Sequence, residues 1–122
     1  MEKKIVVAGC RNYNNYNEAS EFISECIGDI NDGCTLVFIS GGCKGADLLG
    51  ERYAAENGHK VERYAAEWNR YGKAAGPKRN EEMAKIADCV ICFWDGKSKG
   101  TNSMIEFAKR FDKQVYVKRV KV

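Results

Sequence analysis

Hydrophobic and polar residues follow one another along the chain in blocks that predict strands and helices in turn. Uninterrupted apolar runs at residues 4–9, 35–39 and 89–94 are typical of strands buried on both faces of a parallel sheet. Between these runs, apolar residues recur at spacings of three and four, which indicates helices that pack one face against the sheet. Such helices are expected at 17–30, 46–56, 81–87 and from Thr101 onward.

Two further strands are expected at the edges of the sheet. Residues 60–64 alternate polar with apolar side chains, and residues 114–122 carry lysines and an arginine that discourage edge-to-edge pairing. Five strands separated by helices predict an α/β fold, a Rossmann-like three-layer sandwich with strand order 3-2-1-4-5. That order places a switch point between the strands at 4–9 and 89–94, where ligands bind at the carboxyl ends.

The helix boundaries and one irregular stretch complete the expected organisation. Asn17 is the expected N-cap of the first helix, Asn31-Asp32-Gly33 its end, and Thr101 the cap of the last helix. Residues 65–80 carry no clear periodicity and predict a loop of 16 residues. Loops of this length in a small domain are usually functional.

Residues 35–47 combine a buried strand, a glycine turn and a helix start, and the chain is organised around them. Gly41, Gly42 and Gly45 would let the backbone approach a phosphate closely, because no Cβ intervenes. Lys44 would add a full positive charge to the dipole of the following helix. The alternative is a tight turn with a solvated lysine, and the stretch alone leaves both interpretations open.

Composition and charge narrow the class of ligand. The 122 residues are sufficient for one domain, residues 1–122, and the net charge is +3. The loops expected at the ligand-binding edge carry eight basic and two acidic side chains, so their net charge is +6 and that of the rest of the chain is −3. These loops are residues 9–16, 40–46, 65–80 and 95–101. The excess indicates an anionic ligand; nucleic acid is less expected, because its binding domains usually have a pI above ~9.

The beginning of the chain and its apolar content bear on location. Met1-Glu2-Lys3-Lys4 leads directly into a strand, without the apolar region of a signal peptide, which predicts a cytoplasmic protein. No stretch approaches the ~20 apolar residues of a membrane span, so no membrane partner is expected.

The six cysteines resemble a disulfide framework only in number. Cys89 and Cys92 lie three apart in a predicted strand and would point to opposite faces, which excludes a redox pair or a shared metal. Burial as small hydrophobes is expected for most of the six, Cys26 among them. Cys10 and Cys43 each follow a glycine at a strand end, where a thiol could be exposed and reactive. No metal site is predicted.

Several motifs, taken in order, resemble one known group of proteins. They are Gly9-Cys10-Arg11, Ser40 to Asp47, Glu67-Trp68, Gly72 to Met83, Phe93 to Gly96 and Lys99-Gly100-Thr101. Together they are similar to the YspA-like branch of the SLOG superfamily, which is similar in fold to DprA and to the LOG phosphoribohydrolases. That superfamily is associated with nucleotides and nucleotide-derived molecules such as ADP-ribose relatives, either as sensors or as enzymes acting on them.

The resemblance implies a set of ligand contacts at the carboxyl edge of the sheet. With Cys10 and Asp95 added, the candidates are Gly9, Cys10, Arg11, Ser40, Gly41, Gly42, Lys44, Gly45, Ala46, Asp47, Arg79, Asn80, Asp95, Gly100 and Thr101. One departure from LOG enzymes concerns catalysis. They carry a glutamate two or three residues after Gly-Thr, whereas Ser103 and Met104 stand there in this chain and the first acid is Glu106.

Most candidates also have a plain structural interpretation. Asp47 could accept a ribose hydroxyl, or merely offset the helix dipole. Arg11 is better explained by a ligand phosphate, since no carboxylate adjoins it in sequence. Asp95 could be a general base, although aspartates at strand ends more commonly cap turns. Trp68 and Tyr71 could stack on a base or form a small hydrophobic cluster of their own.

The sequence favours binding of a phosphorylated, nucleotide-derived small molecule, as a sensor or sequestering module. One alternative is a nucleotide-processing hydrolase or transferase with Asp95, Glu67 or Glu106 as acid or base, and another is DprA-like DNA binding. His59 is interpreted as a solvated turn residue. The sequence leaves open whether the ligand is turned over, any cofactor besides that ligand, and the oligomeric state, with a homo-oligomer among the options.

Overall fold

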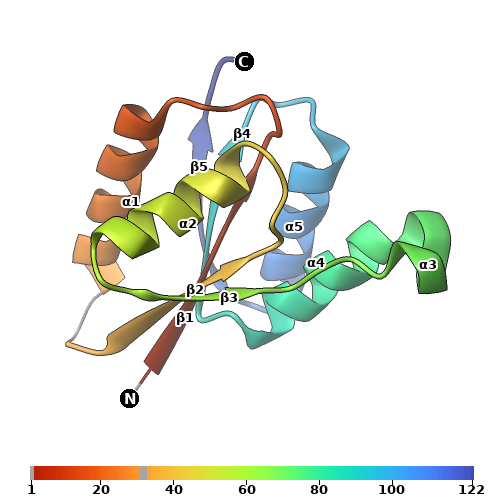
Figure 1. Cartoon of the computed structure of the whole chain (residues 1–122), viewed down its shortest axis with the longest axis horizontal. Helices are drawn as coiled ribbons and strands as arrows, with labels where there is room; N and C mark the ends of the chain where they lie inside the picture. The colour runs from red at the N-terminus through yellow and green to blue at the C-terminus, as the bar shows by residue number, and fades with distance from the viewer. Residues whose placement is uncertain (1, 31–32) are drawn as a thin grey trace.

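The computed structural model describes residues 2–30 and 33–122, which build a five-stranded sheet with helices on both faces (Figure 1). The strand order is β3-β2-β1-β4-β5, and every neighbouring pair is parallel. The strands are β1 (Glu2–Gly9), β2 (Thr35–Ser40), β3 (Lys60–Arg63), β4 (Cys89–Trp94) and β5 (Gln114–Arg119). The predicted strand order is therefore confirmed.

The sheet separates two hydrophobic clusters, one under each pair of helices. The long helices are α1 (Tyr16–Ile30), α2 (Ala46–Glu56), α4 (Ala75–Ile86) and α5 (Lys99–Arg110). Along β1, Ile5 and Val7 pack toward α1 and α2, whereas Val6 and Ala8 pack toward α4 and α5. Alternate side chains of each central strand thus reach opposite layers. The three-layer Rossmann-like sandwich is confirmed (Figure 1).

Residues 65–80 are more regular than predicted. A short helix α3 (Trp68–Tyr71) and a 3-10 turn η1 (Gly72–Ala74) lead into α4, which begins at Ala75 and not at Glu81. Pro77 is the third residue of α4, where the backbone N–H of another residue would have no intrahelical partner. The α3–η1 segment projects from the body of the fold (Figure 1).

The caps of two helices also differ from the prediction. At α1, the Glu18 amide donates to the side-chain oxygen of Asn15 at 3.1 Å, so Asn15 caps the helix and Asn17 does not. The predicted end at 31–32 lies outside the described residues. At α5, the N-cap is Ser98, whose hydroxyl accepts from the Thr101 amide at 3.3 Å, and Thr101 lies inside the helix.

The positions of Cys89 and Cys92, of Cys10 and of His59 can be compared with three further predictions. Cys89 and Cys92 belong to opposite hydrophobic clusters, as predicted. The prediction of an exposed Cys10 is wrong: Cys10 is only 4% exposed, and burial raises the pKa of its thiol. His59 is not simply solvated, because its ring stacks on Phe38 with 5.4 Å between centroids.

Within the described residues, no helix has both the length and the apolar content to cross a lipid bilayer.

Candidate functional site

A hollow of about 350 Å³ opens at the carboxyl ends of β1 and β4, where the strand order reverses. Its walls come from the loops after β1 and β2, the start of α2, α4, the turn after β4 and the start of α5. The lining residues are Ala8, Gly9, Cys10, Arg11, Asn12, Cys43, Asp47, Arg79, Asn80, Met83, Asp95, Ser98, Gly100, Thr101 and Met104. The volume lies within the usual range for small-molecule sites.

The loops after β1 and β2 pack tightly against each other behind the hollow. The Ala46 amide donates to the Cys10 carbonyl oxygen at 3.3 Å. Gly45 has a φ of 80°, and a Cβ there would collide with the carbonyl oxygen of Cys10 and lie 2.6 Å from that of Arg11. Glycine is therefore required at position 45 by the contact between the two loops. Neither Gly45 nor Ala46 lines the hollow.

Ser40 and the first two glycines of the turn are likewise engaged with the protein itself. The Ser40 hydroxyl donates to Glu51 at 2.6 Å and accepts from the Gly42 amide at 3.0 Å. A Cβ on Gly41 would lie 2.7 Å from a guanidinium nitrogen of Arg79. Ser40, Gly41 and Gly42 do not line the hollow, and neither does Lys44, which is exposed to solvent. The glycine-rich turn thus supports the wall of the hollow.

Arg79 ties α4 to the ends of β2 and β3. Its guanidinium donates to the Gly41 carbonyl oxygen at 3.0 Å, to the Tyr64 carbonyl oxygen at 3.5 Å and to the Cys43 sulfur at 3.7 Å. The next residue, Asn80, donates to the Gly100 carbonyl oxygen at 3.4 Å. Two consecutive residues of α4 therefore join both sides of the hollow.

Asp47 is a buried carboxylate in the wall of the hollow. It is 5% exposed, and its Oδ2 accepts from the Cys43 amide at 3.3 Å. Burial raises its pKa to about 6, and this outweighs the opposing effects of the Cys43 amide and the Arg79 charge. Asp47 is thus an acid of raised pKa in a position where it can touch a ligand.

Asp95 is held in the turn that precedes α5. One oxygen, Oδ1, accepts from the amides of Lys97 and Ser98, both at 2.8 Å. These two hydrogen bonds lower the pKa of Asp95, so the group stays ionised. This turn also places Ser98 as the N-cap of α5. The amides of Lys99 and Gly100, in the first turn of the helix, have no intrahelical acceptor and can bind an anion.

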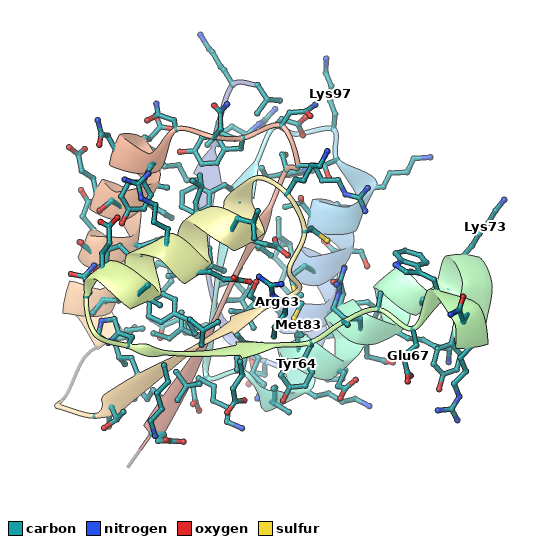
Figure 2. All side chains as sticks on the ribbon, in the orientation of Figure 1. Arg63, Tyr64, Glu67, Lys73, Met83 and Lys97 are labelled. Atoms are coloured by element: carbon teal, nitrogen blue, oxygen red, sulfur yellow. The ribbon has the colours of Figure 1, made fainter. Side chains whose placement is uncertain are left out.

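The charge inside the hollow is nearly balanced. Its charged lining residues are Arg11 and Arg79 against Asp47 and Asp95. Arg11 is exposed and has no hydrogen-bond or ion-pair partner among the described residues. Lys73, on the projecting segment, and Lys97 point away from the body of the fold (Figure 2). The positive charge predicted at this edge is thus spread more widely than expected, and Arg11 is the cation best placed for a ligand.

The hollow brings together part of the predicted site. Of the predicted ligand contacts, those that line it are Gly9, Cys10, Arg11, Asp47, Arg79, Asn80, Asp95, Gly100 and Thr101; those that do not are Ser40, Gly41, Gly42, Lys44, Gly45 and Ala46. Cys43, which lies within the motif from Ser40 to Asp47, also lines the hollow. Among the catalytic candidates, only Asp95 lines it, since Glu67 and Glu106 are exposed elsewhere.

Sequence reasoning missed several lining residues. They are Ala8, Asn12, Met83, Ser98 and Met104. Ser98 carried a usable signal, because a serine three residues before Thr101 and ahead of an apolar helical stripe is typical of an N-cap. Met83 and Met104 fall on the apolar faces of the helices expected at 81–87 and from Thr101 onward, and apolar residues at helical spacing predict packing against the sheet.

Comparisons with known proteins agree with this fold. The family described as "YspA, cpYpsA-related SLOG family" matches residues 3–71, which is more than half of the chain. The Gene 61 protein of Mycobacterium phage D29 is 37% identical over 81 residues, covering 62% of this chain and 65% of that protein. The chain therefore spans about two thirds of the length of this curated relative.

Two solved structures are similar in fold. DNA processing protein A (DprA) from Streptococcus pneumoniae matches with a TM-score of 0.73 and 20% identity, over 100% of this chain and 52% of that one. DprA from Helicobacter pylori, reported for its single-stranded DNA binding mode, matches with a TM-score of 0.72 and 18% identity. That match covers 98% of this chain and 66% of the other. At these identities the likeness shows the fold alone.

Proposed function

Since the chain belongs to the YspA, cpYpsA-related SLOG family, we propose that it binds a phosphorylated, nucleotide-derived small molecule in the hollow, as a sensor or sequestering module. One observation carries the proposal: Arg11, which has no partner among residues 2–30 and 33–122, and the first turn of α5 line the same hollow at the switch point of the sheet. Open helix amides and an arginine without a partner are the groups that proteins use for phosphate.

Each wall of the hollow would take a different part of the ligand. The phosphate would lie between Arg11 and the amide of Gly100, where no neighbouring atom obstructs the backbone. Gly100 has open space on its Cα side, which allows an oxygen to come close. Asn12 would supply an amide group for the sugar or the base, whereas both ends of the Asn80 amide are engaged within the protein, by the Arg79 guanidinium and by the Gly100 carbonyl oxygen.

The carboxylates of the chain favour binding over turnover. Glu67 and Glu106 lie outside the hollow, and Asp95 is an ionised turn residue with Oδ1 already engaged twice. A general acid or base needs reach to the reacting proton and a pKa near the working pH. Of the two carboxylates that line the hollow, Asp95 has a lowered pKa and Asp47 a pKa raised by burial to about 6, so Asp47 is the residue that a test for turnover has to address.

A thermal-shift screen with AMP, ADP, NAD and ADP-ribose tests the proposal. At least one compound is expected to raise the melting temperature, since a ligand at 100 times its Kd stabilises a protein by about 2.7 kcal/mol. Chromatography of the incubated compound then distinguishes a binder from an enzyme. No shift with any phosphorylated nucleoside would reject the proposal.

Single-stranded DNA is the rival ligand, because a structural neighbour is reported for binding it. Steeply salt-dependent binding of an oligonucleotide, unaffected by an excess of the small nucleotides, would favour DNA. Competition by the small nucleotides at the same site would favour the proposal.

A further inference from the structure

Asp47 is a buried acid that the protein only partly compensates. The Cys43 amide donates to its Oδ2 at 3.3 Å and the Gly41 amide also favours its ionised form, but no side chain in the described part of the chain donates to it. The guanidinium of the nearby Arg79 donates to the carbonyl oxygens of Gly41 and Tyr64, to Asn80 Oδ1 and to the Cys43 sulfur. A buried carboxylate with so few donors is costly to keep ionised.

The groups around Asp47 come from every element that packs on it. From α4, Arg79 favours the ionised form, and from α2, Glu51 opposes it. From β4, Cys92 faces it as a neutral thiol, because burial raises the pKa of that thiol far above neutrality. The amides of Gly41 and Cys43 favour ionisation. Across the hollow lie Arg11 and Asp95, one cation and one anion.

An anion in the hollow would disturb this balance strongly. It would add negative charge beside a carboxylate that is 5% exposed, in a place where water screens poorly. It would also offset the field of Arg79, the cation whose charge favours the ionised form of Asp47. Both effects favour the neutral carboxylic acid, which can in addition donate its O–H to a phosphate oxygen.

We propose that the hollow takes up an anion together with one proton, and that Asp47 is the group that receives this proton. The proton comes from solvent and ends on a carboxylate oxygen of Asp47, and no other bond is made or broken. The inference rests on the proposed function, because it concerns the same hollow. It adds that ligand affinity is tied to pH through a named residue.

In the protein without ligand, the pKa of Asp47 already makes protonation accessible. Burial already raises the pKa of Asp47 to about 6, so protonation at neutral pH costs only about a factor of ten in population. If the bound anion raises that pKa to 8 or above, affinity will increase as pH falls from about 8 toward about 6 and level off below. Each unit of pH within this window is worth up to about tenfold in Kd.

The direct test is the pKa of Asp47 measured by carbon-13 NMR of its carboxyl group, with and without sodium sulfate. Sulfate does not titrate near neutral pH, and sodium chloride at equal ionic strength is the reference. A rise of at least about one unit with sulfate is expected. The same measurement with NAD, whose pyrophosphate also does not titrate there, extends the test to a nucleotide.

Calorimetry of NAD binding in two buffers of different ionisation enthalpy supplies the second readout. Net uptake of between half and one proton near pH 7 is expected for the wild type, and none for Asp47→Asn. Glu106→Gln, an exposed acid on α5 outside the hollow, should leave the uptake unchanged.

The two proposals fail in different ways. If neither sulfate nor NAD raises the pKa of Asp47, or if proton uptake persists in Asp47→Asn, the inference is overturned even where nucleotides bind. If sulfate raises that pKa and no nucleoside phosphate binds, the proton-coupled anion site stands and the nucleotide ligand is rejected.

Discussion

The guanidinium of Arg79, on α4, donates a 3.0 Å hydrogen bond to the carbonyl oxygen of Gly41, the residue that follows β2. This bond joins one layer of helices to the end of a central strand. It also closes one side of the hollow, because the same side chain lines it. Glycine at position 41 makes the approach feasible, since a Cβ there would lie 2.7 Å from the guanidinium.

Arg79→Ala is therefore expected to destabilise the fold by about 1–3 kcal/mol, because it leaves the Gly41 carbonyl without its donor. Arg79→Lys should recover little of this, since an ammonium cannot reproduce the arginine fork. The matched control is Lys78→Ala, which removes an exposed charge next to it and a cation–π contact of 4.8 Å with Tyr71. Urea unfolding measures all three; equal losses for Arg79→Ala and Lys78→Ala would contradict the assignment.

Gly45→Ala should destabilise the protein by more than about 2 kcal/mol, because its φ of 80° excludes most side chains and its Cβ would strike the Cys10 carbonyl. Gly28→Ala serves as the control, since Gly28 is an exposed residue of α1 and nothing lies within 4 Å of the added Cβ. It should stabilise the protein by up to about 1 kcal/mol. Thermal unfolding compares the two, and a Gly45→Ala protein as stable as the wild type would disprove the loop contact.

These two sites show what the sequence could and could not predict. Apolar runs such as that at β4 are typical of strands buried on both faces of a parallel sheet, so the central strands followed from the pattern and their order from the usual topology of such folds. The role of Gly45 could not be predicted from the sequence. A glycine that permits a phosphate to approach and one that permits another loop to approach have the same local sequence, and only the position of Cys10 distinguishes them.

The second limit concerns helix starts. Gly72, Gly76 and Pro77 indicate a loop when each is considered alone, yet Gly76 and Pro77 occupy the first turn of α4. The first four amides of a helix lack intrahelical partners, so proline is tolerated there. Because that turn continues into Arg79 and Asn80, the same misinterpretation placed two lining residues on a loop when they belong to a helix.

Ser98→Ala should cost α5 about 0.5–2 kcal/mol, because the Thr101 amide would lose its 3.3 Å acceptor. Ser98→Asp should restore most of the loss, since aspartate is an equally good N-cap. Ser103→Ala, a serine inside the same helix, is the control and should be close to neutral. Guanidinium unfolding distinguishes these outcomes; a neutral Ser98→Ala would show that another group caps the helix.

Arg11→Ala should weaken binding of ADP-ribose or NAD by tenfold or more while leaving stability unchanged, because its guanidinium has no partner within the described part of the chain. Lys97→Ala is the matched control, since Lys97 points away from the body of the fold (Figure 2). Calorimetry gives the affinities and thermal unfolding the stability. Equal weakening by both substitutions would indicate a diffuse electrostatic effect in place of a specific contact.

Asp47→Asn should change how stability depends on pH. The folded-state pKa of about 6 lies above the unfolded value of about 3.9, so the folded protein binds more protons between these limits. Wild-type stability should thus fall by about 3 kcal/mol as pH rises from about 4 to about 6 and then stay level with respect to this group. The asparagine side chain can still accept from the Cys43 amide and does not ionise, so the Asp47→Asn variant should lack this fall and exceed the wild type in stability above about pH 6.

The control is Glu106→Gln, at an exposed residue of α5, which should follow the wild-type curve. Urea unfolding across this pH range measures the effect, and a fall of the same size in Asp47→Asn would assign the titration to another group.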